Sequence, residues 1–197
     1  LGMLKRACDL EPYNPSVLNH LANHYFYRAD YKKALALAER ASKHCEAKTI
    51  RAESNYHMAR CHHAEGNYQM ALQCYVEAHK CNPVYTAPLF GLGQMHLVNN
   101  DTKKATSCFE KVLRAQPDNT DALKALGHLY MRDGKTAEAL EKLNKASEQA
   151  PDDASVWLLL AQLQQHLPSG LPKALKAYEK AAGLLKRQPG GVPATLW

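Results

Sequence analysis

Two pairs of side chains in this sequence have the spacing of metal ligands on a helix. His20 and His24 lie four residues apart, and His57 and Cys61 repeat the spacing. That interval places both side chains on one face of a helix, as in zinc sites. A zinc protease would carry Glu beside the first His, where this chain has Leu21. The second pair follows the first at a repeat interval, so the pairs point the same way rather than converge. We predict packing roles for them, with no metal and no cofactor.

Other chemical motifs are equally incomplete. The stretch Cys61–His63 has no resolving cysteine nearby, and none of the six cysteines forms a CxxC pair, so we read them as reduced thiols of a cytosolic or nuclear protein. Gly91–His96 resembles a glycine-rich phosphate loop but follows no expected strand. There is no P-loop, GxSxG or clustered carboxylate pair. The sequence therefore predicts no enzyme and no catalytic residue.

Composition favours a helical fold. Hydrophobic residues make up 46% of the 197 residues, Leu and Ala dominate them, and β-branched residues are scarce. The net charge is +6 and evenly spread, with 11 Lys and Arg against 8 acids in residues 1–98 and 14 against 11 in residues 99–197. This pattern disfavours direct nucleic-acid binding. The longest apolar run, Val156–Ala161, is too short for a bilayer, and no signal peptide is visible, so we expect no membrane association.

A repeat of about 34 residues organises the chain. Equivalent alanines are spaced by 37, 34 and 34 residues, at Ala34, Ala71, Ala105 and Ala139. A proline closes each of three units, at Pro83, Pro117 and Pro151. Such a period predicts stacked helical hairpins. Gly66 and Gly134 are expected to supply left-handed turns between the helices of a hairpin.

The residue types at fixed repeat positions resemble the tetratricopeptide repeat. A small residue recurs on the first helix, at Ala22, Ala59, Gly93, Gly127 and Ala161, and a larger one on the second in most units, at Ala38, Tyr75, Phe109, Leu143 and Tyr178. The resemblance implies an all-α, right-handed α-α superhelix, a tetratricopeptide-repeat solenoid of five full repeats plus partial repeats at both ends. We expect repeats at 15–51, 52–85, 86–119, 120–153 and 154–188, a partial repeat at 1–14 and the start of another at 189–197, all in a single segment of a longer solenoid.

In such a solenoid the first helices of the repeats line a concave groove. Helical spacing selects the residues opposite the packed face, and surface aromatic and apolar side chains there suit a bound peptide or helix. The predicted groove residues are Asn19, Asn23, Tyr27, Tyr56, Arg60, His63, Phe90, Gln94, Val98, Lys124, His128 and Arg132. The same register adds Phe26, Leu97, Met131, Gln162, Gln165 and His166. An alternative is that some of these side chains pack between neighbouring helices.

One known use of such grooves does not fit. Chaperone-binding members of the family grip a C-terminal carboxylate with Lys, Asn and Arg at fixed repeat positions. Here those positions hold Asn19 and Asn23, then His57, then Ala87 and Gly91. We therefore do not expect a co-chaperone.

Several strings resemble a narrower group, the tetratricopeptide scaffold subunits of the RNA polymerase II-associated factor (PAF) complex. These strings are Asn14–Tyr31, Ala52–His63, Phe90–His96, Cys108–Leu113 and Pro151–Leu163. The resemblance implies a nuclear, non-enzymatic scaffold that joins other subunits of a transcription elongation complex and supports RNA polymerase II transcription and linked histone modification. The alternatives are a generic adaptor of another assembly, such as a ubiquitin ligase or a transport complex, and a nucleic-acid binder.

Overall fold

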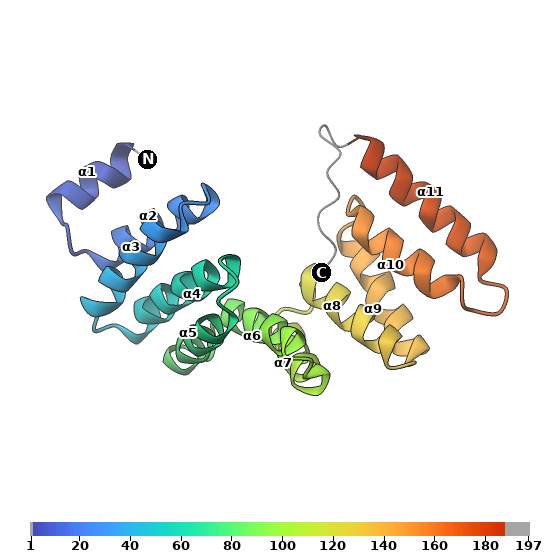
Figure 1. Ribbon diagram of the computed structural model, residues 1–197. Coiled ribbons are helices and arrows are strands. Elements are labelled where there is room, and N and C mark those ends of the chain that lie inside the picture. The colour runs from blue at the N-terminus through green and yellow to red at the C-terminus, as the bar shows by residue number, and fades with distance from the viewer. Residues whose placement is uncertain (1, 188–197) are drawn as a thin grey trace. The chain divides into compact units, whose positions relative to one another are not determined.

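The computed structural model describes residues 2–187, and this part of the chain is entirely helical between its turns. It contains the helices α1 (Gly2–Leu10), α2 (Pro15–Tyr27), α3 (Tyr31–Lys43), α4 (Lys48–Ala64), α5 (Tyr68–Cys81), α6 (Ala87–Val98), α7 (Thr102–Ala115), α8 (Thr120–Arg132), α9 (Thr136–Gln149), α10 (Ala154–Gln164) and α11 (Leu171–Arg187) (Figure 1). The all-α prediction is confirmed. The expected opening of a further repeat at 189–197 lies outside the described residues. None of the described helices is long and apolar enough to cross a membrane.

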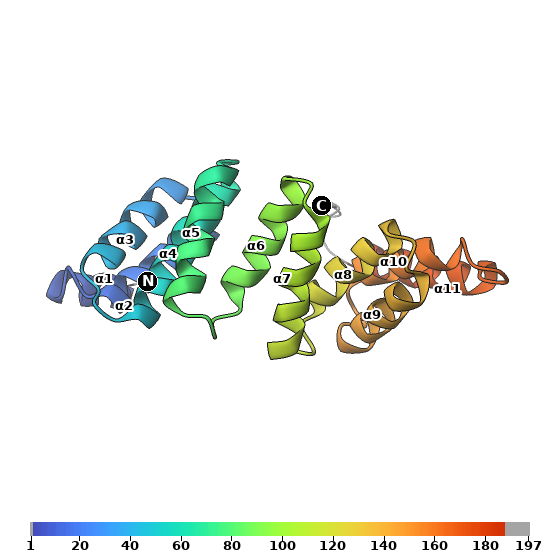
Figure 2. The ribbon, with the colours of Figure 1, turned by 90° about the horizontal axis from the view of Figure 1, so that it is seen from below.

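The helices form two compact units, residues 1–108 and 109–197, whose division falls within α7. In the first unit, α2 packs against α3 as a hairpin and α4 against α5. Each hairpin contacts the next one, because α3 packs against α4 and α5 packs against α6. The first helices of successive hairpins are also in contact: α2 contacts α4, and α4 contacts α6. We call α2, α4 and α6 the A helices of this unit. Figure 2 shows the hairpins of this unit from below.

The second unit repeats the pattern. The hairpins α8–α9 and α10–α11 pack on each other through α9 with α10 and α8 with α10. The larger residues expected to fill the hairpin interiors are buried in both units. Tyr75, Phe109 and Leu143 are at most 2% exposed. Tyr178, the fifth residue of that set, is only half-buried, and Ala174, Ala177 and Ala181 form the buried face of α11.

Polar N-caps begin several of the helices. Asn14, Asp30, Asn67, Asn119 and Asp153 each accept a hydrogen bond from a backbone N–H of the first helical turn. These bonds satisfy donors that have no partner within the helix. The expected closing prolines, at 83, 117 and 151, each lie two residues after the end of a helix, α5, α7 and α9 respectively. Local sequence therefore fixes where each hairpin starts and stops.

The turns within the hairpins share one left-handed residue. Gly66 and Gly134 adopt φ of +78° and +72°, as predicted. The equivalent turn positions after α2 and α6 hold Ala29 and Asn100, both at φ +58°. Residues other than Gly and Asn rarely adopt this conformation, so the residue type of Ala29 does not predict its role in the turn.

Glycine on the first helix of a hairpin permits close helix packing. A Cβ on Gly127 would lie 2.6 Å from the Leu143 side chain, which agrees with the small residue expected there. A Cβ on Gly91 would lie 2.4 Å from the Tyr75 ring of the preceding hairpin. Gly91 thus lets α6 approach α5 closely.

Candidate protein-interaction surface

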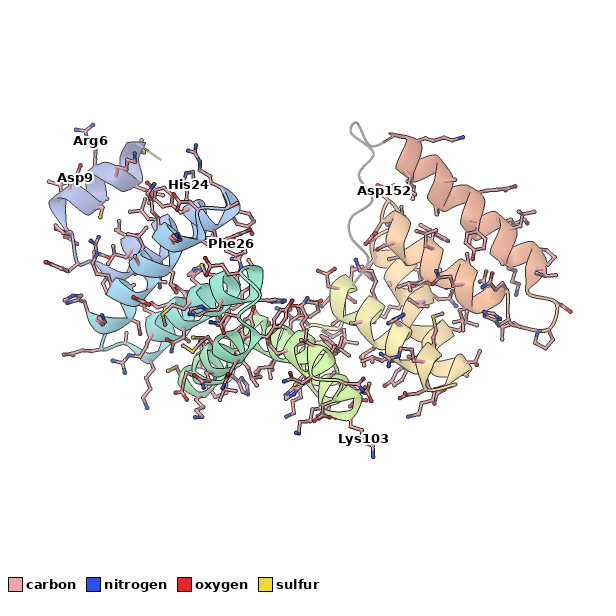
Figure 3. The ribbon with its side chains drawn as sticks, viewed as in Figure 1. Arg6, Asp9, His24, Phe26, Lys103 and Asp152 are labelled. Atoms are coloured by element: carbon pink, nitrogen blue, oxygen red, sulfur yellow. The ribbon has the colours of Figure 1, made fainter. Side chains whose placement is uncertain are left out.

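Five polar and aromatic side chains gather where the C-terminal halves of α2 and α4 lie side by side. They are Asn23, Phe26 and Tyr27 of α2 with Tyr56 and Arg60 of α4, and we call them the Arg60 cluster. Phe26 lies near the end of α2 that is next to α4 (Figure 3). The hairpin repeat brings the two helices together, although 37 residues separate Asn23 from Arg60. Four of these five were predicted as groove residues, and the same register gave Phe26.

Arg60 is held in the centre of this cluster. Its guanidinium carbon lies 3.7 Å from the centroid of the Phe26 ring, 5.2 Å from that of Tyr27 and 5.5 Å from that of Tyr56. Its Nη1 donates a hydrogen bond of 3.0 Å to Asn23 Oδ1. A cation over an aromatic ring contributes about 0.5–2 kcal/mol, depending on how far it is desolvated. The half-buried guanidinium is therefore ordered before any partner arrives.

Aromatic rings continue from this cluster toward α6. Tyr56 contacts Tyr85, with ring centroids 5.3 Å apart, and Tyr75 at 6.1 Å. Burial raises the pKa of all three phenols, so they are neutral at physiological pH. Tyr85 was not among the predicted residues. It lies in the turn before α6, where helical periodicity gives no information about direction.

The neighbouring histidines are uncharged at neutral pH. Burial, with smaller contributions from Arg60 and His20, lowers the pKa of His57 to about 4. Burial also lowers the pKa of His63, whose Nδ1 lies 3.5 Å from the Tyr75 hydroxyl. The positive charge of this surface at pH 7 is therefore that of Arg60.

Two predicted groove residues are buried between helices instead. Asn19 is 3% exposed, donates a hydrogen bond to the Ile50 carbonyl at 3.2 Å and accepts one from the Ser54 hydroxyl at 2.9 Å. These bonds tie α2 to α4. Asn19 therefore follows the alternative reading, in which a groove position packs between neighbouring helices. Its amide group is already hydrogen-bonded within the chain.

Lys124 is the second buried residue of the predicted set. Its ammonium lies 2.7 Å from Asp153 Oδ2 and 3.1 Å from Asp121 Oδ1, with 11% of its side chain exposed. Burial lowers the pKa of Lys124, but the hydrogen bonds to the two carboxylates outweigh it and raise the pKa overall. Lys124 therefore connects α8 to the start of α10.

The remaining predicted residues lie further along the A helices and on α8. Val98 is 49% exposed at the end of α6, and Phe90 and Gln94 of the same helix are half-buried. His128 and Arg132 are exposed on α8, in the second unit. The structure thus brings Asn23, Tyr27, Tyr56 and Arg60 together, with His63 one turn further along α4.

The potential metal ligands and thiols do not form a reactive centre. Within residues 2–187 no group of three His, Cys, Asp or Glu side chains could hold a metal ion. Burial raises the pKa of Cys61 to about 11 and also raises that of Cys74, so both stay protonated and weakly nucleophilic. Each unit has a shallow open pocket away from the predicted residues. One, of about 290 Å³, is lined by Tyr25 and Arg40, and the other, of about 370 Å³, by Tyr130 and Glu110.

The class of protein follows from these hairpins and from comparison with known families. Residues 52–84 and 96–163 each match a model of the tetratricopeptide repeat family, and together the matches cover just over half of the chain. The chain therefore belongs to the tetratricopeptide repeat proteins, and the predicted solenoid class is confirmed.

The curated proteins to which the chain is similar include two relatives of one kind. It is 36% identical over 102 residues to the RNA polymerase-associated protein CTR9 of Caenorhabditis elegans, and 36% identical over 101 residues to the protein CTR9 homolog of Arabidopsis thaliana. These alignments cover 51% and 49% of this chain but 9% of each relative. The chain thus corresponds to a small part of either protein.

Solved structures show the same fold at low sequence identity. A MamA structure from Desulfovibrio magneticus RS-1 has a TM-score of 0.72 at 20% identity and covers 89% of this chain and 97% of its own. YrrB, described as a tetratricopeptide protein with an unusual peptide-binding site, has a TM-score of 0.69 at 17% identity and covers 94% and 93%. These similarities concern the fold alone.

Proposed function

We propose that this protein is a non-enzymatic scaffold that binds segments of other proteins along its A helices. The observation that carries the proposal is the Arg60 cluster, where ordered aromatic and polar side chains from two successive repeats form one surface. Tyr27 is 75% exposed at its edge. Aromatic residues and arginine are the side chains that contribute most energy at protein interfaces.

The similarity to CTR9 supports a role in a transcription-associated complex. We infer that the protein works in the nucleus with subunits of an RNA polymerase-associated elongation assembly, as the names of its relatives suggest. The other predicted groove residues, including Phe90, Gln94 and Val98, extend the same surface in this proposal. His128 and Arg132 provide a second surface in the second unit.

Site-specific photocrosslinking tests both parts of this proposal. A benzophenone side chain is placed at position 27 of the protein expressed in cells, and at position 103 as a control. Lys103 extends outward at the start of α7, away from the A helices of the first unit (Figure 3). We expect crosslinks from position 27 to subunits of an elongation complex, and few from position 103.

The two parts fail in different ways. Crosslinks from position 103 but not from position 27 would show that partners bind another face. Crosslinks from position 27 to proteins of a different assembly would support the surface and refute the role in transcription elongation.

A further inference from the structure

We infer that the Arg60 cluster binds an acidic segment of a partner protein. An Asp or Glu carboxylate of that segment would pair with the Arg60 guanidinium, and an apolar side chain beside it would rest on Tyr27. This inference rests on the proposed function, because it names the chemistry of the partner that the same surface would take.

Arg60 makes no ion pair with an acidic side chain of the described residues, although it is held in place by rings and an amide. Six lysines each lie within 3.3 Å of a carboxylate of this chain, namely Lys33, Lys80, Lys104, Lys124, Lys142 and Lys145. No Asp or Glu of residues 2–187 makes an ion pair with Arg60. Its charge is therefore available to an outside anion.

The A helices around Arg60 are almost free of negative charge. Helices α2 and α6 contain no Asp or Glu, and α4 contains only Glu53. Glu53 is seven residues before Arg60, which is about 10 Å along the helix. The other acid nearby in the sequence is Glu65, the exposed C-cap residue of α4, five residues after Arg60. A carboxylate approaching the Arg60 cluster would therefore meet little repulsion, which is the charge complementarity expected for an acidic partner.

The packing of Arg60 suits it to a carboxylate. The Phe26 ring covers one face of the guanidinium and Asn23 accepts a single hydrogen bond from it. The N–H groups of a guanidinium lie in its plane, so stacking on a ring leaves them able to form the paired hydrogen bonds that a carboxylate accepts. Because the side chain is already ordered, less entropy is lost on binding.

The same charges disfavour a nucleic-acid backbone. A strand of RNA or DNA needs a series of cations along its path. The other cations of the A helices are Lys48 and Arg51, near the start of α4. Arg51 lies about 14 Å from Arg60 along the helix and donates to the Cys45 carbonyl. A single unpaired guanidinium beside neutral aromatic rings fits one carboxylate better than a phosphodiester chain.

A displayed library of random 12-residue peptides, selected on the 197-residue chain, tests this inference. We expect the enriched peptides to share an Asp or Glu next to an apolar residue. For the strongest binder, fluorescence anisotropy should show about a tenfold loss of affinity when that acid is replaced by its amide. Arg60→Met should cause a similar loss, and Arg60→Lys a smaller one. Lys103→Met, which removes an exposed positive charge elsewhere in the unit, should leave affinity unchanged.

The amide peptide keeps the test valid even if an Arg60 variant does not fold, since it leaves the protein unaltered. Enriched peptides that are neutral or basic, or that bind Arg60→Met and Arg60→Lys as tightly as the wild type, would overturn the acidic partner. If such peptides still lost affinity with Tyr27→Ala, the proposed surface would stand. If no enriched peptide responded to Tyr27→Ala, the surface would fail as well. Tighter binding of a 12-nucleotide oligouridine than of any peptide would indicate a nucleic acid instead.

Discussion

Replacing Lys124 by methionine should destabilise the second unit without affecting peptide binding at the Arg60 cluster. Lys124 was predicted as a groove residue, but the structure buries it between α8 and α10. Methionine retains the apolar part of the side chain and removes the ammonium. The variant therefore isolates the interaction of this charge with Asp153 and Asp121.

The expected magnitude follows from the exposure of the three side chains. Removing one member of a fully buried ion pair costs about 3–5 kcal/mol, whereas exposed pairs contribute about 0–1 kcal/mol. Lys124 is nearly buried, but the side chains of Asp153 and Asp121 are 30% and 63% exposed, so water can solvate the carboxylates that remain. We expect Lys124→Met to lower the free energy of unfolding by about 1–2 kcal/mol, between these limits.

A double-mutant cycle measured by urea denaturation separates the pair from other effects. Asp153→Asn is the matched change, because Asp153 also caps α10 through the Ser155 N–H and asparagine caps a helix equally well. At pH 7 the coupling between Lys124→Met and Asp153→Asn should be about 1 kcal/mol. A coupling near zero would refute the view that Lys124 connects the two hairpins.

The pH dependence provides a second check on the same pair. Burial raises the pKa of Asp153, but the hydrogen bonds from Lys124 and Ser155 outweigh it and hold the pKa below the ordinary 3.8. The stabilisation is therefore present above pH 3.8 and lost as the pH falls through the lower pKa of the folded state. The wild type and Lys124→Met should converge in stability at the acidic end. Loss of peptide binding in Lys124→Met at unchanged stability would instead favour the original groove assignment.

Two further predictions concern the packing around the A helices. Gly91→Ala should lower the free energy of unfolding by about 1–2 kcal/mol, because its Cβ would overlap the buried Tyr75 ring and the gain in helix propensity offsets only part of this cost. The control is Gly183→Ala, where the added Cβ would have no atom within 4 Å, and it should stabilise the protein by about 0.5–1 kcal/mol. Equal effects of the two substitutions in urea denaturation would contradict the close contact between Gly91 and Tyr75. Below pH 6.5 the unfolded chain takes up a proton at His57 that the folded state does not accept until about pH 4, so stability should fall over this range by up to about 3 kcal/mol. His57→Leu should remove that part of the pH dependence, and parallel curves for the two proteins would contradict the burial of a neutral imidazole.

The position and type of the helices could be predicted from the sequence because they depend on local chemistry. Capping residues such as Asn14 and Asp153, the left-handed Gly66 and Gly134, and the closing prolines act within a few residues of where they stand. The 34-residue spacing of the alanines then predicts that the hairpins stack. Ala29 shows the limit of this reading, because it adopts a turn conformation that its residue type does not favour.

The tertiary structure decided which polar residues of the predicted groove bind neighbouring helices and which remain available. Helical periodicity gives the direction of a side chain around its own helix, but it does not give the groups that the next helix places opposite. Asn19 meets Ser54 and the Ile50 carbonyl, and Lys124 meets two carboxylates, so both are consumed by packing. Arg60 meets aromatic rings and one amide, and its charge remains unpaired because the helices around it carry almost no acid.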